Sequence, residues 1–281
     1  MTHAGAWTDV DEQGFQRLVG DAQGLADVSE KIVAGQQGDL LFEDATLYPG
    51  ATLIHLERWA AIQFAGGLLM LTRPQVANAS ITLLRGVLEA YSHVWWIRQG
   101  TPTGADSQRC RALCYEHSIA RELSDAVTNA PKEVTTPEAA PEAKRRVANL
   151  EKLMQSLGCE CKGRDYTDVM PTFREIAKSE NVTWLPEMVR ATRMTSHQAQ
   201  RDRIMRYADD GAIEVGGPAT PFERSVLLEW LVTIFGRLGR EVAMILEPKS
   251  EADLLSHLTQ LKAKISFLRQ YLSQSGPAAA P

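Results

Sequence analysis

Arg85, Glu89 and His93 follow one another at intervals of four residues inside a stretch that is otherwise almost wholly apolar. Residues four apart lie on one face of a helix, so Arg85 and Glu89 are placed to form an ion pair and His93 extends the row. Charges inside an apolar helix must be paired or serve a function. Two interpretations stay open: an internal ion pair that fixes packing, or a polar pocket wall where Arg85 offers donors to an anion and Glu89 orients it.

A second group of residues suited to chemistry lies in residues 190–206, the densest cationic stretch of this acidic chain. It contains Arg190 and Arg193, followed by the neighbours Ser196 and His197 at an expected helix end. An arginine facing a phosphate, with a histidine that titrates near neutral pH, could support RNA cleavage by the 2′-hydroxyl without a metal. The alternative is a solvated basic face. Ser196 and His197 make a poor nucleophile–base pair, because neighbours on a helix diverge.

The four cysteines form one pair at helical spacing, Cys110 and Cys114, and one pair in a loop, Cys159 and Cys161. Structural zinc sites space the two ligands of a pair by two to four residues, which only the first pair satisfies. The N-terminus has no charged segment followed by an apolar run, so no secretory signal is indicated. We therefore expect reduced thiols in a cytoplasmic protein, with no metal and no cofactor.

The composition is that of an ordinary globular protein, with 44% hydrophobic and 23% charged residues and a formal net charge of −5. An acidic chain has no bulk attraction to nucleic acid or to an anionic membrane. The most apolar window, residues 59–72, is too short to span a bilayer. Glycine-rich phosphate loops and the GxGxxG, HExxH and GxSxG motifs are absent from the sequence. We expect a soluble protein without a membrane partner.

Apolar residues recur at helical spacing through most of the chain and predict one all-α domain, residues 1–281, of about eight helices. The stretch 77–98 is apolar on almost every side, which predicts a buried central helix. It should pair in an antiparallel hairpin with a helix over 50–72. Residues 129–142 are rich in proline, alanine and glutamate and predict an exposed loop.

The C-terminal segment, residues 249–275, carries apolar residues at alternating steps of four and three. Such a seam packs against a second helix, either of the same chain or of a partner. We expect a docking or dimerisation helix, and a homodimer formed through it. The seam residues are Leu254, Leu258, Leu261, Ile265, Leu268 and Leu272.

The segments LLRGVLEAYSHVWW and RMTSHQ together resemble a group of uncharacterised all-helical bacterial proteins. Members of that group carry a Leu-Leu-Arg-x-x-x-Glu helix and, further along the chain, a segment with serine and histidine. The matching positions here are Arg85, Glu89, Ser196 and His197, within a region of similarity that covers roughly residues 53–246. The resemblance implies an all-α fold and no agreed activity.

A more distant similarity is to the HEPN superfamily, helical bundles whose ribonuclease members use an Arg-x(4–6)-His motif across a dimer interface. Arg190 and His197 meet the upper limit of that spacing, whereas Arg193 is too close to His197. Ala191 stands where those nucleases usually have a polar residue. The resemblance implies metal-independent RNA cleavage of the toxin or phage-defence type. His197 would then be the acid and base, and Arg190 or Arg193 would stabilise the phosphate.

Two functional hypotheses follow from the sequence. The first is an endoribonuclease with RNA as its partner, in which Arg85 and Glu89 support His197. The second is a non-catalytic helical module that binds a partner protein or a small anionic ligand. The position of His197 relative to Arg85 and Glu89 distinguishes the two hypotheses.

Overall fold

The computed structural model describes residues 9–34, 49–131, 136–161, 169–194, 205–207, 213–215 and 219–274. Within these ranges it contains nine α-helices and one short antiparallel strand pair, which confirms the predicted all-α bundle. The helices are α1 (Asp9–Ala34), α2 (Gly50–Leu71), α3 (Ser80–Arg98), α4 (Gln108–Asn129), α5 (Ala139–Ser156), α6 (Met170–Ser179), α7 (Leu185–Met194), α9 (Pro221–Leu246) and α10 (Glu251–Gln274). The strands β1 (Met205–Tyr207) and β2 (Ile213–Val215) pair with Arg206 opposite Glu214.

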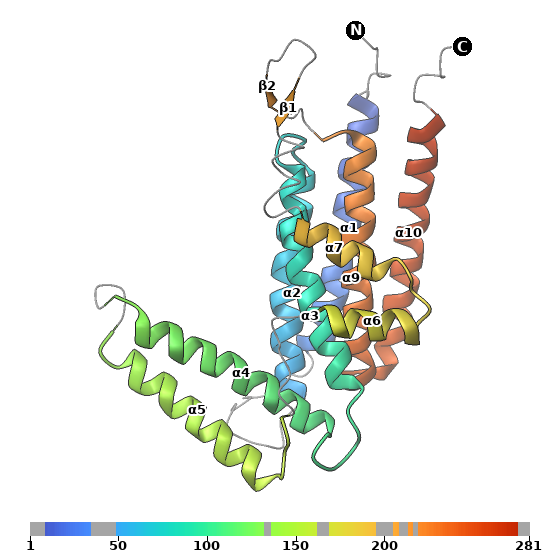
Figure 1. Ribbon diagram of the computed structural model, residues 1–281. Helices are drawn as coiled ribbons and strands as arrows, with labels where there is room; N and C mark the ends of the chain where they lie inside the picture. The colour runs from blue at the N-terminus through green and yellow to red at the C-terminus, as the bar shows by residue number, and fades with distance from the viewer. Residues whose placement is uncertain are drawn as a thin grey trace.

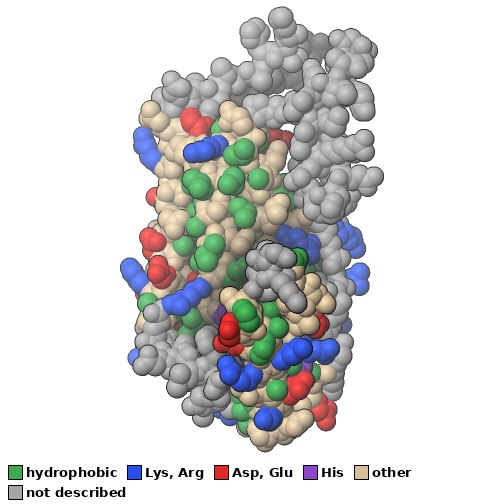
Figure 2. All heavy atoms as spheres, turned by 90° about the vertical axis from the view of Figure 1, so that its left-hand side faces the viewer, with side chains coloured by type: hydrophobic (Ala, Val, Ile, Leu, Met, Phe, Trp, Pro, Cys, Tyr) green, Lys and Arg blue, Asp and Glu red, His purple; other side chains and the backbone are tan. Residues whose placement is uncertain are grey.

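The long helices α1, α2, α3, α9 and α10 run side by side as an upright bundle (Figure 1). Helices α6 and α7 lie across this bundle, and α4 and α5 form a hairpin that projects from its lower end. Figure 2 turns that side toward the viewer and shows apolar side chains on the face of the bundle above the hairpin. Helix α2 exposes three large apolar side chains, Trp59, Ile62 and Leu69. One continuous apolar core nevertheless reaches from α1 to α10 and into the hairpin.

Helix α3 is the centre of the bundle, as its apolar composition predicts, and it packs between α2 and α9. Leu84, Val87 and Val94 on α3 are completely buried. The α-helix begins at Ser80, after a 3₁₀ turn over Ala77–Ala79, slightly later than the predicted start. Its hairpin partner is α2, in agreement with the sequence.

Glycines let the helices of the bundle approach one another closely. A Cβ atom on Gly67 of α2 would lie 2.9 Å from the side chain of Leu231 on α9. A Cβ atom on Gly236 of α9 would lie 2.7 Å from the side chain of Leu258 on α10. Contacts this short do not occur between real atoms, so both positions require glycine to avoid a shift of the neighbouring leucine.

Helix α9 begins at the sequence TPFE with a capping box. The hydroxyl of Thr220 accepts a hydrogen bond from the backbone N–H of Glu223 at 3.2 Å. The carboxylate of Glu223 accepts one from the N–H of Thr220 at 2.8 Å. Two otherwise unpaired backbone donors are thereby satisfied, which fixes the start of the helix.

A buried arginine ties three helices together at one end of the bundle. Arg224 of α9 is 1% exposed and donates two hydrogen bonds of 2.8 Å to the carboxylate of Glu12 on α1. Its Nε donates to the carbonyl of Leu71 on α2 at 3.0 Å. Its guanidinium carbon lies 4.2 Å from the ring centre of Phe15. Every contact of this cation therefore crosses between helices.

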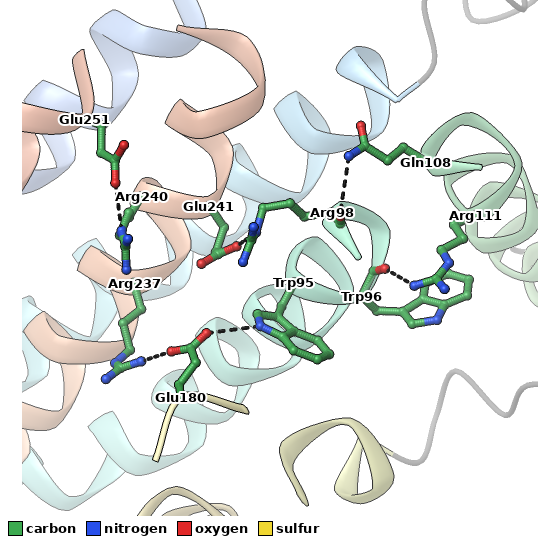
Figure 3. A network of polar contacts seen from close by, with 10 residues as sticks. All are labelled: Trp95, Trp96, Arg98, Gln108, Arg111, Glu180, Arg237, Arg240, Glu241 and Glu251. Atoms are coloured by element: carbon green, nitrogen blue, oxygen red, sulfur yellow. Dashed lines mark hydrogen bonds and ion pairs between the residues drawn. The ribbon is translucent and has the colours of Figure 1, made fainter. Parts of the chain in front are cut away.

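Polar contacts also surround the C-terminal half of α3 (Figure 3). Arg98 of α3 forms an ion pair with Glu241 of α9. The pKa of Glu241 is raised, chiefly because burial disfavours its charged form, although Arg98 opposes that effect. Arg240, the preceding residue of α9, pairs with Glu251 of α10 at 2.8 Å. These pairs fix the register of α3, α9 and α10 at this level of the bundle.

The heptad seam of α10 packs within its own chain. Leu254, Leu261 and Ile265 are buried, and α10 lies against α9 and α1. The exposed large side chains of α10 include Phe267 and Tyr271, which lie off the seam. Helix α10 therefore docks against helices of its own chain, and the homodimer stays a prediction.

The predicted loop over residues 129–142 is wrong at both ends. Asn129 is the last residue of α4, and α5 already begins at Ala139. Ala139 and Ala140 are strong helix formers, and Pro141 is tolerated in a first turn because its missing N–H needs no partner there. The connection is therefore shorter than the composition indicated.

The prediction of four reduced thiols is also wrong. Cys110 is bonded to Cys159, and Cys114 to Cys161, so that no free thiol remains. The helices α4 and α5 are antiparallel, which brings the end of α5 beside the first turns of α4. The two disulfides therefore join the start of α4 to the segment that follows α5.

In the described part of the chain, no helix is long and apolar enough to cross a membrane.

Candidate functional site

The predicted ion pair between Arg85 and Glu89 is present. The Nε of Arg85 donates to Oε1 of Glu89 at 2.8 Å, and the two side chains are 26% and 31% exposed. A pair in contact with water to this extent contributes little to stability. A purely structural explanation of the pair is therefore weak, and its surroundings decide its role.

Two members of the polar row, Glu89 and His93, line a pocket between α2, α3 and α4. Its volume is about 360 Å³, at the small end of the range for ligand pockets. Glu89 and His93 contribute the wall on α3, whereas Arg85 lies outside the lining. The remaining lining residues are His55, Leu56 and Trp59 of α2 and Tyr115, Ile119 and Glu122 of α4. Glu89 and His93 therefore form part of a pocket wall, whereas the position of Arg85 does not support its predicted role as a donor to a bound anion.

Two buried rings form the inner end of the pocket. The rings of His93 and Tyr115 lie 4.7 Å apart between centres, at an angle of 42°. The pKa of the Tyr115 hydroxyl is raised, first because the group is buried and then because the carboxylates of Glu116, Glu122 and Glu89 repel a second negative charge. The phenol therefore stays protonated at neutral pH.

The pocket combines carboxylates with aromatic faces. Arg85 neutralises Glu89, whereas Glu122 is exposed on α4 and has no ion-pair partner among the residues that the structure describes. Among the residues that the structure describes, no lysine or arginine lines the pocket. Trp59 and Tyr115 offer ring faces, which attract cations through their negative π-systems. This chemistry suits a small cation with an apolar body.

The pocket is not arranged as a metal site. Within the described ranges, no group of three or more histidine, cysteine, aspartate or glutamate side chains is placed to hold a metal ion. Its two histidines and two glutamates are therefore spread around the wall, where they can contact different parts of an organic ligand.

The predicted nuclease residues are only partly described. Arg190 lies on the exposed side of α7. Arg193 belongs to α7, but its side chain lies outside the described part of the structure, as do Ser196 and His197 altogether. Proximity of His197 to the polar row therefore stays a prediction.

Sequence reasoning missed the wall of the pocket that α2 and α4 provide. His55 and Trp59 are four residues apart on α2, and Tyr115 and Glu122 are seven apart on α4, so each pair shares one helix face. That spacing was a usable signal for each helix alone. Only the packing of α2 and α4 on either side of α3 shows that these faces meet.

Comparison with known proteins adds no family to this description. The chain matches no protein-family model, no curated protein and no solved structure. The similarities to the bacterial helical group and to the HEPN superfamily stay predictions.

Proposed function

We propose that this chain is a helical binding protein whose pocket between α2, α3 and α4 takes a small organic cation with an apolar body. The observation that carries the proposal is the lining itself. Glu89 and Glu122 share a pocket of about 360 Å³ with the ring faces of Trp59 and Tyr115, and none of its described lining residues is a lysine or arginine. The proposal keeps the non-catalytic hypothesis from the sequence and reverses the expected charge of its ligand.

The reversal of charge follows from the position of Arg85. The sequence indicated an anion because Arg85 offers a fork of donors. In the structure that side chain pairs with Glu89 and does not line the pocket. A ligand inside the pocket therefore meets carboxylates and rings, which favour an ammonium group over a carboxylate or phosphate.

Titration calorimetry of the full chain tests the proposal with four probes. Choline and cadaverine represent a quaternary ammonium and a primary amine, and acetate and inorganic phosphate represent anions. We expect at least one amine to bind measurably and both anions to bind at least about tenfold more weakly, a difference of about 1.4 kcal/mol. Equal or tighter binding of the anions would contradict the proposal.

A variant that removes a charge from the pocket tests whether the amine binds there. Glu122→Gln keeps the size of the side chain and removes its charge, and we expect it to weaken amine binding about fivefold, or about 1 kcal/mol, for a partly solvated ion pair. Glu138→Gln makes the same change at the exposed N-terminus of α5, outside the pocket, and should leave the affinity unchanged. Amine binding that is insensitive to Glu122→Gln would place the ligand elsewhere.

Removal of a ring face provides a second check. Trp59 is 37% exposed, so Trp59→Leu is expected to be tolerated by the fold while it removes the cation–π contact. Choline should lose more affinity than cadaverine, because a quaternary ammonium has no N–H to donate to the carboxylates. A circular dichroism melt of each variant verifies that the fold is intact.

RNA cleavage and a cytoplasmic location stay predictions from the sequence. Comparison of single-stranded RNA cleavage by the wild-type chain and by His197→Ala tests the first. Loss of cleavage in the variant would support the assignment of His197, and equal cleavage would contradict it. The two disulfides weigh against the cytoplasmic location, because such bonds are most common in proteins of oxidising compartments.

A further inference from the structure

A second, larger pocket lies between the end of α3, the start of α4 and α6. Its volume is about 590 Å³, and none of its described lining residues also lines the pocket of the proposed function. Trp95, Trp96 and Gln99 line it from α3, and Arg111 lines it from α4. The α6 side consists of Glu175, Lys178 and Ser179. Trp96 is half-buried and offers a ring in the pocket wall, whereas Trp95 is 5% exposed and contributes only a small part of its ring.

The first of these rings is held in place from outside the pocket. The indole N–H of Trp95 donates to Oε1 of Glu180 at 3.0 Å, and Trp95 is 5% exposed. Glu180, just after α6, forms an ion pair with Arg237 of α9 (Figure 3). The Trp95 ring is therefore fixed before any ligand arrives, which keeps this part of the pocket wall in place.

Arg111 is fixed against the second ring. Its Nε and one terminal nitrogen donate to the carboxylate of Asp106 at 2.8 and 2.7 Å, and its other terminal nitrogen donates to the carbonyl of Trp96 at 2.6 Å. The guanidinium carbon lies 5.2 Å from the centre of the Trp96 ring. A guanidinium has five N–H donors, so these three bonds leave two for a ligand.

Lys178 adds a second cation at the edge of the pocket. It lies on the exposed side of α6, one turn after Glu175, and has no described ion-pair partner. Its ammonium can reach an anionic group that also meets Arg111, since both side chains line one cavity. Glu175 offers an acceptor for an N–H or amino group of the ligand.

We infer that this pocket binds a planar aromatic molecule that carries an anionic group and a ring donor. The ring lies against Trp96, the anion meets the two remaining N–H donors of Arg111 and the ammonium of Lys178, and the donor faces Glu175. A nucleoside monophosphate and an aromatic carboxylate such as an indole acid share this chemistry. The inference does not depend on the proposed function, because the two pockets have separate lining residues.

Isothermal titration of the full chain with adenosine monophosphate and indole-3-acetate tests the inference and separates the two ligand sources. Adenosine, which has the aromatic ring but no anionic group, and inorganic phosphate, which has the charge but no ring, serve as controls. We expect at least one of the two aromatic anions to bind at least about tenfold more tightly than either control. If neither aromatic anion binds, or if the controls bind equally well, the inference is overturned.

Variants then place the ligand in the pocket. Lys178→Ala removes an exposed side chain and should weaken binding about fivefold or more, whereas Lys152→Ala on the exposed side of α5 should not. Trp96→Leu should weaken binding of the aromatic anion more than binding of phosphate, whereas Phe267→Leu, at an exposed ring of α10 outside both pockets, should change neither. Binding that survives both Lys178→Ala and Trp96→Leu overturns the inference.

Discussion

The two disulfides close almost the same loop, so their contributions to stability should be strongly coupled. Cys110 and Cys159 are 49 residues apart in sequence, and Cys114 and Cys161 are 47 apart. Either bond alone restrains the unfolded chain by joining the start of α4 to the segment after α5. Once one bond exists, the second closes only a small ring through one turn of α4 and the short loop segment.

The two loop sizes give the expected magnitudes. In the chain-entropy description, closing a loop of roughly 50 residues stabilises the folded state by about 4 kcal/mol, and closing a ring of roughly eight residues by about 2.5 kcal/mol. Removal of either bond should therefore cost about 2.5 kcal/mol, whereas removal of both should cost about 6.5 kcal/mol. The double loss exceeds the sum of the two single losses by about 1.5 kcal/mol.

A double-mutant cycle measures this coupling. The variants are Cys110→Ala with Cys159→Ala, Cys114→Ala with Cys161→Ala, and all four substitutions together. Urea unfolding without reductant gives the free energy of unfolding of each variant. Packing losses at the buried cysteines enter both sides of the cycle and largely cancel, so the difference reports the shared loop.

Two results would refute the reasoning. Single losses that add up to the quadruple loss would show that the two bonds restrain the unfolded chain independently. Thiols that react in the wild-type protein, unfolded without reductant, would show that the disulfides are not formed. Reduction of the wild-type protein should otherwise destabilise it about as much as the quadruple substitution does.

Three further predictions test the packing of the bundle. Arg224→Lys should lower the free energy of unfolding by about 3 kcal/mol in urea titrations, because a lysine cannot reproduce the buried bidentate contact, whereas Arg240→Lys at a half-exposed pair should cost under about 1 kcal/mol. Burial raises the pKa of Glu57, so the contribution of this group to the free energy of unfolding falls as the pH rises from 4.5 through that raised pKa. In melts across pH, Glu57→Gln should match the wild type below 4.5 and should be more stable than the wild type at neutral pH. Gly236→Ala should cost about 1–3 kcal/mol through its clash with α10, whereas Gly20→Ala, where a Cβ meets nothing within 4 Å, should stabilise α1 by up to about 1 kcal/mol.

Local patterns in the sequence were sufficient for the helices and for the ion pair on α3. The steps of three and four predicted α3 as the buried centre, because its apolar residues cover nearly every side. The capping box at Thr220 and the pair between Arg85 and Glu89 were also predictable. Each of these involves residues at most four apart, whose geometry a helix dictates.

Contacts between distant segments could not be predicted in the same way. Periodicity shows which residues share a face and not which other face will cover them. Arg224 meets Glu12 across 212 residues, and Trp95 meets Glu180 across 85. Phe222 lies at helical spacing with buried residues of α9, yet it is 44% exposed, and the guanidinium carbon of Arg269 lies 5.5 Å from its ring centre. The cysteine pairing and both pockets belong to this class.

Helix α4 supplies a wall to both pockets, and the two walls lie one turn apart. Arg111 lines the pocket beside α6, and Tyr115, four residues later, lines the pocket beside α2. A rigid helix cannot tilt or rotate at one of these positions without moving the other. A ligand that displaces α4 at one pocket therefore alters the second pocket as well. Thermodynamic linkage then requires the reciprocal effect, in which the second ligand changes the affinity of the first by the same factor.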